Sequence, residues 1–476
     1  MATIAKSYFS LFTTANSNAS ADAFSVFDED NYSSYASTQA KTSDISYSSS
    51  TGRITFSEAG TYLIIVNAAA KNHGSGADTV DILTKINGTE ISDVEPFQIQ
   101  VQSANDEKSA TYHFVKTISA DDYLEVFMDS DTADTFSAQS GFSIAVIRAR
   151  GNYGHLIYTA DATTVSVAGG ATTTKTSFDS DLGGTVSSTT SGVTYTAGDG
   201  TLTPSVTTNY LMFSNMVLNQ SQAGDSQSRS DQKLFVNGSE IVLAGAMGYA
   251  NAVSEHTIGI IKNLTKDLTA SRRIQHLNLT AASNRTFTEE KGSAFTIFDI
   301  SDGHATSPSL PANRLSISTA EISTALETDL ADYNVFDQAN YGGSLTKTDH
   351  IEASNITFTA DGGTFSFGEA GDYFISFTVP LDESGFNEEV TLEINRTPLG
   401  GAESTVYSVV EGANATSGPI KEIGAHVILT LAEGDILKFV LNNPEGQTYL
   451  GTSLTIYNVD SATAVETTIA ALPESP

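Results

Sequence analysis

The chain contains FSEAGTYLIIV at residues 56–66 and, in a second copy, FGEAGDYFISF at residues 367–377. Each copy follows another shared stretch, FSVFDEDNY at residues 24–32 and YNVFDQANY at residues 333–341. The two stretches keep nearly the same separation in both copies. Matching segments that hold their spacing in this way indicate a duplicated domain.

A third, more divergent copy lies between these two. The stretch LFVNGSEI at residues 234–241 matches ILTKINGTEI at residues 82–91 around a shared Asn-Gly pair. The pair Phe178-Asp179 stands where the first copy has Phe27-Asp28. The chain therefore carries three copies of one unit.

Glycine, serine and proline cluster between the copies, at residues 150–154 and 301–311, as expected for joints between domains. We predict three domains, residues 1–152, 153–303 and 304–476, the last with a C-terminal tail. Each is long enough to bury a hydrophobic core of its own.

Short runs of β-branched and aromatic residues predict strands, for example at residues 62–66, 373–377 and 427–431. The pairs Asn87-Gly88 and Asn237-Gly238 favour tight hairpin turns, because both central residues of such a turn need a positive φ. We therefore predict an all-β, mostly antiparallel fold. One stretch, from Ile317 to Leu330, has a spacing of apolar residues that predicts a helix.

The order of these motifs resembles the jelly roll of tumour necrosis factor and of the complement globular head. The resemblance implies three tandem antiparallel jelly-roll β-sandwiches. Because jelly rolls of this family form tight trimers, it also implies a homotrimer, with Tyr62, Tyr373 and Tyr210 near the threefold axis. The alternative is that these tyrosines are ordinary core residues of a monomeric sandwich.

Composition excludes several classes of protein. The chain has no cysteine, so no disulfide scaffold is expected. Its first residues lack the apolar core of a secretory leader, and no apolar run approaches the roughly 20 residues that cross a bilayer. A net charge of −33 argues against a nucleic-acid partner, because phosphate contacts need clustered lysine and arginine.

The charge is distributed unevenly along the chain. Residues 1–154 carry a net charge of −10, residues 155–300 carry −3 and residues 301–476 carry −20. The middle part holds the one basic cluster of the sequence, which consists of Lys262, Lys266, Arg272 and Arg273. This cluster is either a solvated surface or a docking site for an acidic partner. Under the docking interpretation, the middle domain faces the partner and the third domain projects into solvent.

No catalytic motif is present in the sequence. It lacks a zinc-protease helix motif, a nucleophile elbow and a phosphate-binding glycine loop, so we expect neither an enzyme nor a cofactor. Asp129, Asp131 and Asp134 are weak candidates for a calcium site, because closely spaced carboxylates can coordinate this ion. The alternative is a plain acidic loop.

Tandem jelly rolls without cysteine or leader, on an acidic chain rich in Ser, Thr, Asn and Gly, resemble a virion structural protein of a tailed bacteriophage, in style a cyanophage. The resemblance implies a trimeric decoration, cement or head-fibre protein on the capsid exterior, made in the host cytoplasm. Its partners would be its own copies and the major capsid protein or another virion protein. Two alternatives remain: a tail fibre or spike adhesin that binds host-surface glycan, and a non-viral extracellular carbohydrate-binding protein.

Overall fold

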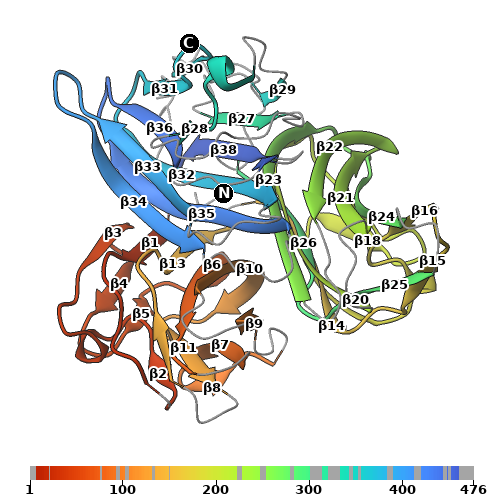
Figure 1. The fold of residues 1–476 in the computed structure, drawn as a ribbon, viewed down its shortest axis with the longest axis horizontal. Helices are drawn as coiled ribbons and strands as arrows, with labels where there is room; N and C mark the ends of the chain where they lie inside the picture. Colours follow the sequence, from red (N-terminus) through yellow and green to blue (C-terminus); the bar gives the residue numbers. More distant parts are fainter. Residues whose placement is uncertain are drawn as a thin grey trace, which may run out of the picture.

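The computed structural model describes residues 7–20, 22–74, 78–92, 97–101, 107–130, 135–149, 151–221, 228–246, 253–278, 284–300, 314–319, 333–341, 347–351, 355–382, 390–411, 420–442, 447–448 and 452–459. These residues form antiparallel strands and three short 3-10 helices, with no α-helix among them. Each sheet is built from one of three stretches, residues 8–148, 153–299 and 314–458, which we call the first, second and third domains. Figure 1 shows them as three lobes that meet in the middle.

The first domain is a sandwich of two sheets. The inner sheet runs in the order β10 (Glu107–Ile118), β6 (Gly60–Asn72), β13 (Ser143–Arg148), β1 (Tyr8–Thr13) and β3 (Ser37–Lys41), and β12 (Phe136–Ala138) also pairs with β6. The outer sheet runs β4 (Ile45–Ser48), β5 (Arg53–Phe56), β11 (Tyr123–Ser130), β7 (Asp78–Ile86) and β8 (Thr89–Glu90), with β2 (Phe24–Ser25) and β9 (Phe97–Val101) at its margins.

The second domain repeats this plan. Its inner sheet contains β15 (Val165–Val167), β25 (Arg285–Glu289), β20 (Thr208–Ser221), β26 (Ala294–Asp299), β14 (Tyr153–Ala160), β17 (Thr185–Ser191) and β23 (Val253–Leu264). Its outer sheet contains β18 (Val193–Thr196), β19 (Thr201–Pro204), β24 (Ala270–Asn278), β21 (Ser228–Val236), β22 (Ser239–Ala246) and β16 (Thr172–Thr176).

The third domain is built in the same way. Its inner sheet contains β29 (Lys347–Ile351), β27 (Arg314–Thr319), β38 (Ser453–Asn458), β32 (Gly371–Asp382), β35 (Ile420–Leu431) and β37 (Gln447–Thr448). Its outer sheet contains β30 (Ile356–Thr359), β31 (Thr364–Phe367), β36 (Ile436–Asn442), β33 (Val390–Thr397), β34 (Ser404–Glu411) and β28 (Tyr333–Asn334). The predicted all-β jelly-roll class is confirmed.

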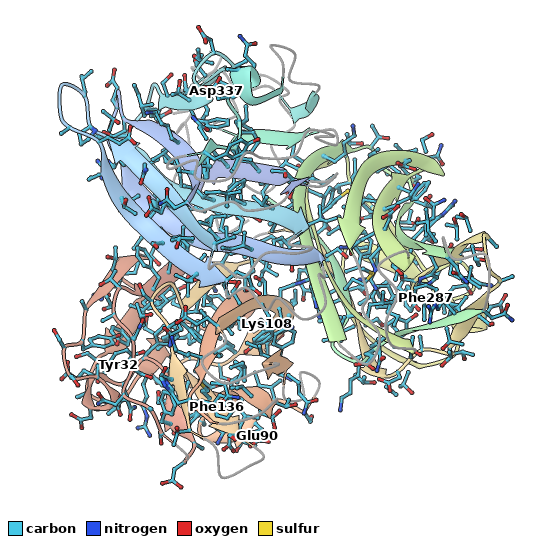
Figure 2. The ribbon with its side chains drawn as sticks, in the orientation of Figure 1. Tyr32, Glu90, Lys108, Phe136, Phe287 and Asp337 are labelled. Carbon is cyan, nitrogen blue, oxygen red and sulfur yellow. The ribbon has the colours of Figure 1, made fainter. Side chains whose placement is uncertain are left out.

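The repeated Phe-Asp motif forms the same local structure in each domain. The carboxylates of Asp28, Asp179 and Asp337 accept backbone N–H bonds at 3.1, 2.9 and 3.0 Å at the start of η1 (Glu29–Asn31), η2 (Ser180–Leu182) and η3 (Gln338–Tyr341). Such a bond satisfies an N–H group that the first turn of a helix leaves without a partner. In Figure 2 the labelled Asp337 lies at the outer end of its lobe, away from where the three lobes meet.

The hairpins predicted at the Asn-Gly pairs are confirmed. Asn87 and Gly88 have φ values of 51° and 76°, and Asn237 and Gly238 have 48° and 76°. The helix predicted over 317–330 is wrong at its start. Residues 317–319 belong to β27, where Ile317 pairs with Leu454 and with Asp349 on either side. Residues 320–332 lie outside the described part of the chain.

Strand alternation gives the inner sheets two apolar faces. In β6, Tyr62, Ile64 and Val66 point into the core of the first domain, whereas Leu63 and Ile65 point out of it. The outward residues join their equivalents from the other two domains in one cluster. The three inner sheets therefore pack against one another where the three lobes meet (Figure 1).

Candidate functional site

The junction between the domains is mostly apolar and buried. Its cluster takes residues from all three domains: Tyr8, Ala40, Leu63, Ile65, Val115, Ala145 and Ile147; then Leu211, Phe213, Ile261 and Phe298; then Phe374, Ile428, Tyr457 and Val459. Burial of aliphatic and aromatic surface on this scale is the dominant favourable term in protein association. We call this cluster the junction.

Hydrogen bonds fix how the domains are oriented across the junction. Tyr407 of the third domain donates to the Gly141 carbonyl of the first at 2.8 Å and accepts from the Asn67 amide at 3.1 Å. Glu411 accepts from both the backbone and the hydroxyl of Ser109. Between the second and third domains, Thr455 donates to the Gly259 carbonyl at 2.7 Å. Directional bonds of this kind select one packing among those that apolar contact alone would allow.

Three buried histidines lie at the junction, one on each of β10, β14 and β35. His113 and His155, from different domains, both hydrogen-bond to the Thr296 hydroxyl, at 2.9 and 2.7 Å. His426 hydrogen-bonds to the Ser376 hydroxyl at 3.0 Å. The ring of Phe213 lies 4.7 Å from that of His113 and 5.4 Å from that of His426, measured between ring centroids.

Burial controls the protonation of these rings, because a charged imidazolium loses its hydration inside the protein. Burial lowers the pKa of His426 to about 3. Burial, together with the nearby His155, Arg272 and His426, lowers the pKa of His113 well below its ordinary value. Both rings are therefore neutral at neutral pH and act as hydrogen-bonding groups without charge. The bond of His113 to Thr296 joins the first and second domains, whereas that of His426 to Ser376 lies within the third.

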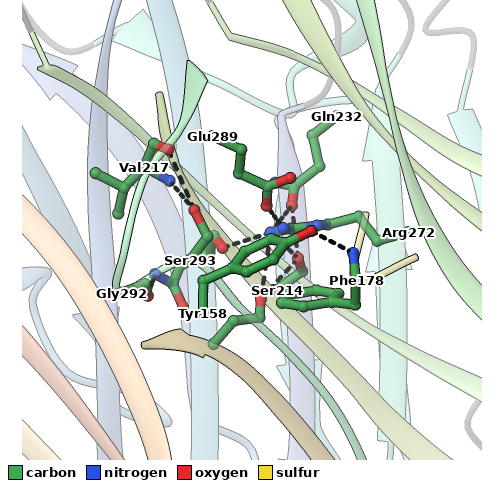
Figure 3. Close-up of polar contacts among 11 residues, drawn as sticks. Tyr158, Phe178, Ser214, Val217, Gln232, Arg272, Glu289, Gly292 and Ser293 are labelled. Atoms are coloured by element: carbon green, nitrogen blue, oxygen red, sulfur yellow. Dashed lines mark hydrogen bonds and ion pairs between the residues drawn. The ribbon is translucent and has the colours of Figure 1, made fainter. Parts of the chain in front are cut away.

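A buried arginine lies behind the junction, inside the second domain (Figure 3). Arg272 forms an ion pair with Glu289 and donates to the Asn215 carbonyl at 2.6 Å and to the Ser214 hydroxyl at 3.3 Å. Its guanidinium also lies over the ring of Phe178, 4.6 Å from the centroid. Burial lowers the pKa of Arg272 to about 9, which still leaves it charged at neutral pH.

The strand registers show that this network replaces apolar core. Arg272 pairs with Leu234 on β21, as Val126 pairs with Thr84 and Phe439 with Ile394 in the other two domains. By the same alignment, Ser214 stands where the other domains have Val66 and Phe377, and Gln232 where they have Ile82 and Leu392. At these three positions the second domain therefore has polar side chains where the other two domains have apolar ones.

A shallow groove of about 410 Å³ opens on the outer side of the first domain. It lies between β2, η1, the turn before β5 and the strand β11, and it is lined by Ala23, Phe24, Ser25, Asp28, Asn31, Ser50, Thr51, Arg53, Glu125 and Phe127. An ion pair between Arg53 and Glu125, 3.1 Å apart, spans β5 and β11 at this site. The guanidinium of Arg53 also lies over the ring of Tyr123.

The three tyrosines that we expected near a threefold axis lie in the cores of the individual domains. Tyr62, Tyr210 and Tyr373 belong to three separate clusters, and their hydroxyls donate to the carbonyls of Glu58, Val206 and Glu369 at 3.0, 3.4 and 2.8 Å. The residues at the junction are their neighbours along each strand, Leu63, Leu211 and Phe374. We expected these three tyrosines near a threefold axis. The structure instead places the next residue along each strand where the three domains meet.

The predicted basic cluster does not form one surface. Arg272 is fully buried and cannot reach a docking partner, whereas Arg273, the next residue on β24, points to the other face and lies over the ring of Phe235. Lys266 is exposed and Lys262 is half-buried on β23. Alternation along a strand separates neighbouring side chains in this way, so adjacent charges in the sequence did not predict a joint site.

The weak calcium site finds no support among the described residues. Asp129 lies on β11 and accepts the backbone N–H of Ser130 at 2.8 Å, while Asp131 and Asp134 lie outside the described residues. In the part of the chain that the structure describes, no group of acidic or histidine side chains could hold a metal ion. Within the same residues, no helix is long and apolar enough to span a membrane.

Sequence reasoning missed the junction histidines and the groove. The histidines are far apart in the sequence and match no motif, yet each sits at an outward position of an inner strand, in phase with junction residues such as Val115 and Ile428. This alternation along the strands is the sequence pattern that could have predicted where the histidines lie. The Arg53–Glu125 pair joins residues 72 positions apart, and only the pairing of β5 with β11 brings them together.

Comparison with solved structures finds similarity, at low coverage, to proteins of the tumour necrosis factor family. The Eiger tumour necrosis factor of S. frugiperda is 13% identical over 32% of this chain and 96% of its own, with a TM-score of 0.25. Murine APRIL, in a crystal structure at pH 8.0, is 12% identical over 30% of this chain and 98% of its own, with a TM-score of 0.23. No protein-family model matches the chain, and no curated protein matches its sequence. The similarity concerns a jelly-roll fold at low coverage and does not extend to activity or partners.

Proposed function

We propose that this chain is a non-enzymatic structural protein of a tailed-bacteriophage particle, placed on the exterior of the capsid as a decoration, cement or head-fibre protein. The observation that supports this most is the junction, because it joins three jelly rolls into one body without any further subunit. A body with a large buried interior and an acidic exterior, at a net charge of −33, suits a particle surface that must remain soluble and unaggregated.

The homotrimer expected from the family resemblance stays a prediction. In this chain, the outward faces of the three inner sheets already meet one another at the junction. The alternative is that the contact between three inner sheets is met inside one chain, which then acts as a monomeric unit. Light scattering separates the two, since a single chain has a mass of 50.1 kDa and a homotrimer three times that mass.

Docking to the capsid shell would use basic residues of the second domain that reach solvent. Lys266, which is exposed, and Lys262 and Arg273, which are half-buried on different sheets, remain candidates, whereas Arg272 is buried. The strongly acidic third domain would project into solvent, where water and salt screen its charge. Attachment through the basic residues should weaken as salt rises, because exposed charges are screened over about 10 Å at 0.1 M salt.

The test is immunogold labelling of purified phage particles with an antibody against this chain, followed by rebinding of the protein to stripped capsids. Gold on the head supports the proposal, and gold confined to the host cell or the culture medium contradicts it. Rebinding of a Lys262→Glu/Lys266→Glu/Arg273→Glu variant should be weaker than that of the unchanged protein. Normal rebinding by this variant would exclude these residues as the anchor.

A second candidate function is an adhesin of the tail fibre or spike type, which binds host-surface glycan. The groove on the first domain favours it, because it combines aromatic rings with hydrogen-bonding side chains on an exposed surface. Labelling at the tail instead of the head would select this alternative.

A further inference from the structure

We propose that the groove of the first domain binds a neutral saccharide, an inference that deepens the adhesin function above and rests on it. At about 410 Å³, the groove falls in the size range of small-ligand sites. It is formed by parts of the chain that are distant in sequence, namely the segment at residues 23–31, the turn at residues 50–53 and the strand β11.

The lining offers hydrogen-bond donors and acceptors side by side. The guanidinium of Arg53 presents only donors and the carboxylate of Glu125 only acceptors, and the two lie 3.1 Å apart. The Glu125 side chain is 8% exposed and that of Arg53 is 45% exposed, so the carboxylate is held in place while the guanidinium reaches solvent. A hydroxyl group both donates and accepts, and two adjacent sugar hydroxyls match such a pair.

An apolar surface adjoins these polar groups. Phe127 follows Glu125 by two positions on β11, so both side chains lie on the same outer face. Its ring is half-buried, and the ammonium of Lys85 lies 4.3 Å from the ring centroid. A sugar ring has an apolar C–H side and a polar hydroxyl edge, so an aromatic ring beside fixed polar groups can contact both.

The other two domains show that the fold does not require this chemistry. In the second domain, the residues that occupy the positions of Arg53 and Glu125 are Thr201 and Ser271, which pair directly across β19 and β24. In the third domain, the register of β31 and β36 gives Thr364 and Lys438. The Phe-Asp turn and 3-10 helix recur in all three domains. Among the described residues, an ion pair between these two positions is found in the first domain, whereas Lys438 of the third pairs with Glu403, the residue before β34.

Charge selects the kind of saccharide. The ionisable lining residues are Arg53 against Asp28 and Glu125, and the Lys85 that lies over Phe127 is paired with Glu90, so the groove carries an excess of negative charge on an already acidic chain. Sialylated, sulfated and uronic-acid sugars would be repelled. Neutral hexoses and N-acetylhexosamines carry the matching hydroxyls without this penalty.

The test uses the full chain on an array of neutral oligosaccharides with terminal glucose, galactose, mannose or N-acetylglucosamine, with sialylated and sulfated sugars as counter-probes. Saturation-transfer NMR and titration calorimetry then measure the affinity for the best neutral probe. The key variant is Arg53→Thr/Glu125→Ser, which copies the pair found in the second domain. It should fold with an unchanged thermal midpoint, since that domain accommodates these residues on the same scaffold.

We expect the variant to lose at least tenfold in affinity, while Lys438→Ser, at the equivalent position of the third domain, binds as the unchanged protein does. Absence of neutral-sugar binding at millimolar concentration, undiminished binding by the folded double variant, or a preference for acidic sugars would each overturn the inference. Head labelling of virions without any sugar binding would remove the saccharide site and leave the decoration function standing.

Discussion

Acidification should loosen the molecule through its buried histidines, before most carboxylates are protonated. Burial lowers the pKa of His426 and of His276 to about 3 and that of His113 well below its usual value. His276 is held by the Ser230 hydroxyl at 2.8 Å and stacks on Phe287. Unfolding returns all three rings to a pKa of about 6.5, so the unfolded chain binds protons that the folded chain excludes.

The sign and size follow from this difference. The folded-state pKa values are depressed, so the stabilisation is complete above pH 6.5 and is lost as the pH falls towards the folded-state values. Between pH 6.5 and its folded-state pKa, each neutral buried histidine lowers the free energy of unfolding by about 1.4 kcal/mol for every unit that the pH falls. The two histidines with a folded-state pKa of about 3, His426 and His276, together give about 4 kcal/mol at pH 5.0, which is close to the whole stability of a typical domain, about 5–15 kcal/mol.

The assay is urea unfolding followed by near-ultraviolet circular dichroism between pH 7.5 and 5.0. An opposing effect is present, because acidification also reduces repulsion on a chain with an isoelectric point near 4.3. The informative quantity is therefore the difference between the unchanged protein and His426→Gln, which keeps a polar side chain that cannot titrate. The variant should lose stability less steeply, by about 1.4 kcal/mol per pH unit. Identical pH slopes for the two proteins would refute the reasoning.

Three further predictions follow from the core and the repeats. Arg272→Val should lower the free energy of unfolding by about 3–5 kcal/mol because it leaves Glu289 buried without its partner, whereas Arg272→Val/Glu289→Leu should recover most of that loss in the same denaturation assay. Tyr62→Ala and Tyr373→Ala should each cost about 3–5 kcal/mol, with Tyr62→Phe much milder; a near-neutral Tyr62→Ala would contradict its burial in the domain core. Gly363→Ala should destabilise more than Gly362→Ala, because both have positive φ but only at Gly363 would a Cβ lie within 2.4 Å of the Asp337 backbone; equal thermal midpoints would argue against that turn geometry.

The sequence predicted the fold well because its strongest signals are local. Asn87-Gly88 needs only its own φ preferences to form a turn, and the Phe-Asp motif needs only a neighbouring N–H group to form its cap. The run YLIIV at residues 62–66 is apolar at every position, which indicates a strand buried on both faces. The sequence did not predict whether the face that carries Leu63 and Ile65 packs against another chain or against another domain of the same chain.

The candidate sites were harder to predict because they depend on register. A charged residue is usually exposed, so Arg272 and Arg273 together resembled a surface cluster. Only the pairing of β24 with β21 shows that Arg272 takes a position filled by Val126 and Phe439 elsewhere. The same holds for Glu125, which meets Arg53 across neighbouring strands.

Placing three lobes on one polypeptide changes what a single substitution can do. In an assembly of three identical subunits, one substitution in the gene changes all three copies. A charge introduced into the core would therefore destabilise every subunit. Here a charge such as that of Arg272 occurs in one domain, and the other two domains keep apolar residues at the same position. Covalent fusion thereby lets each lobe acquire its own chemistry while the relative number of the three stays fixed at one to one to one.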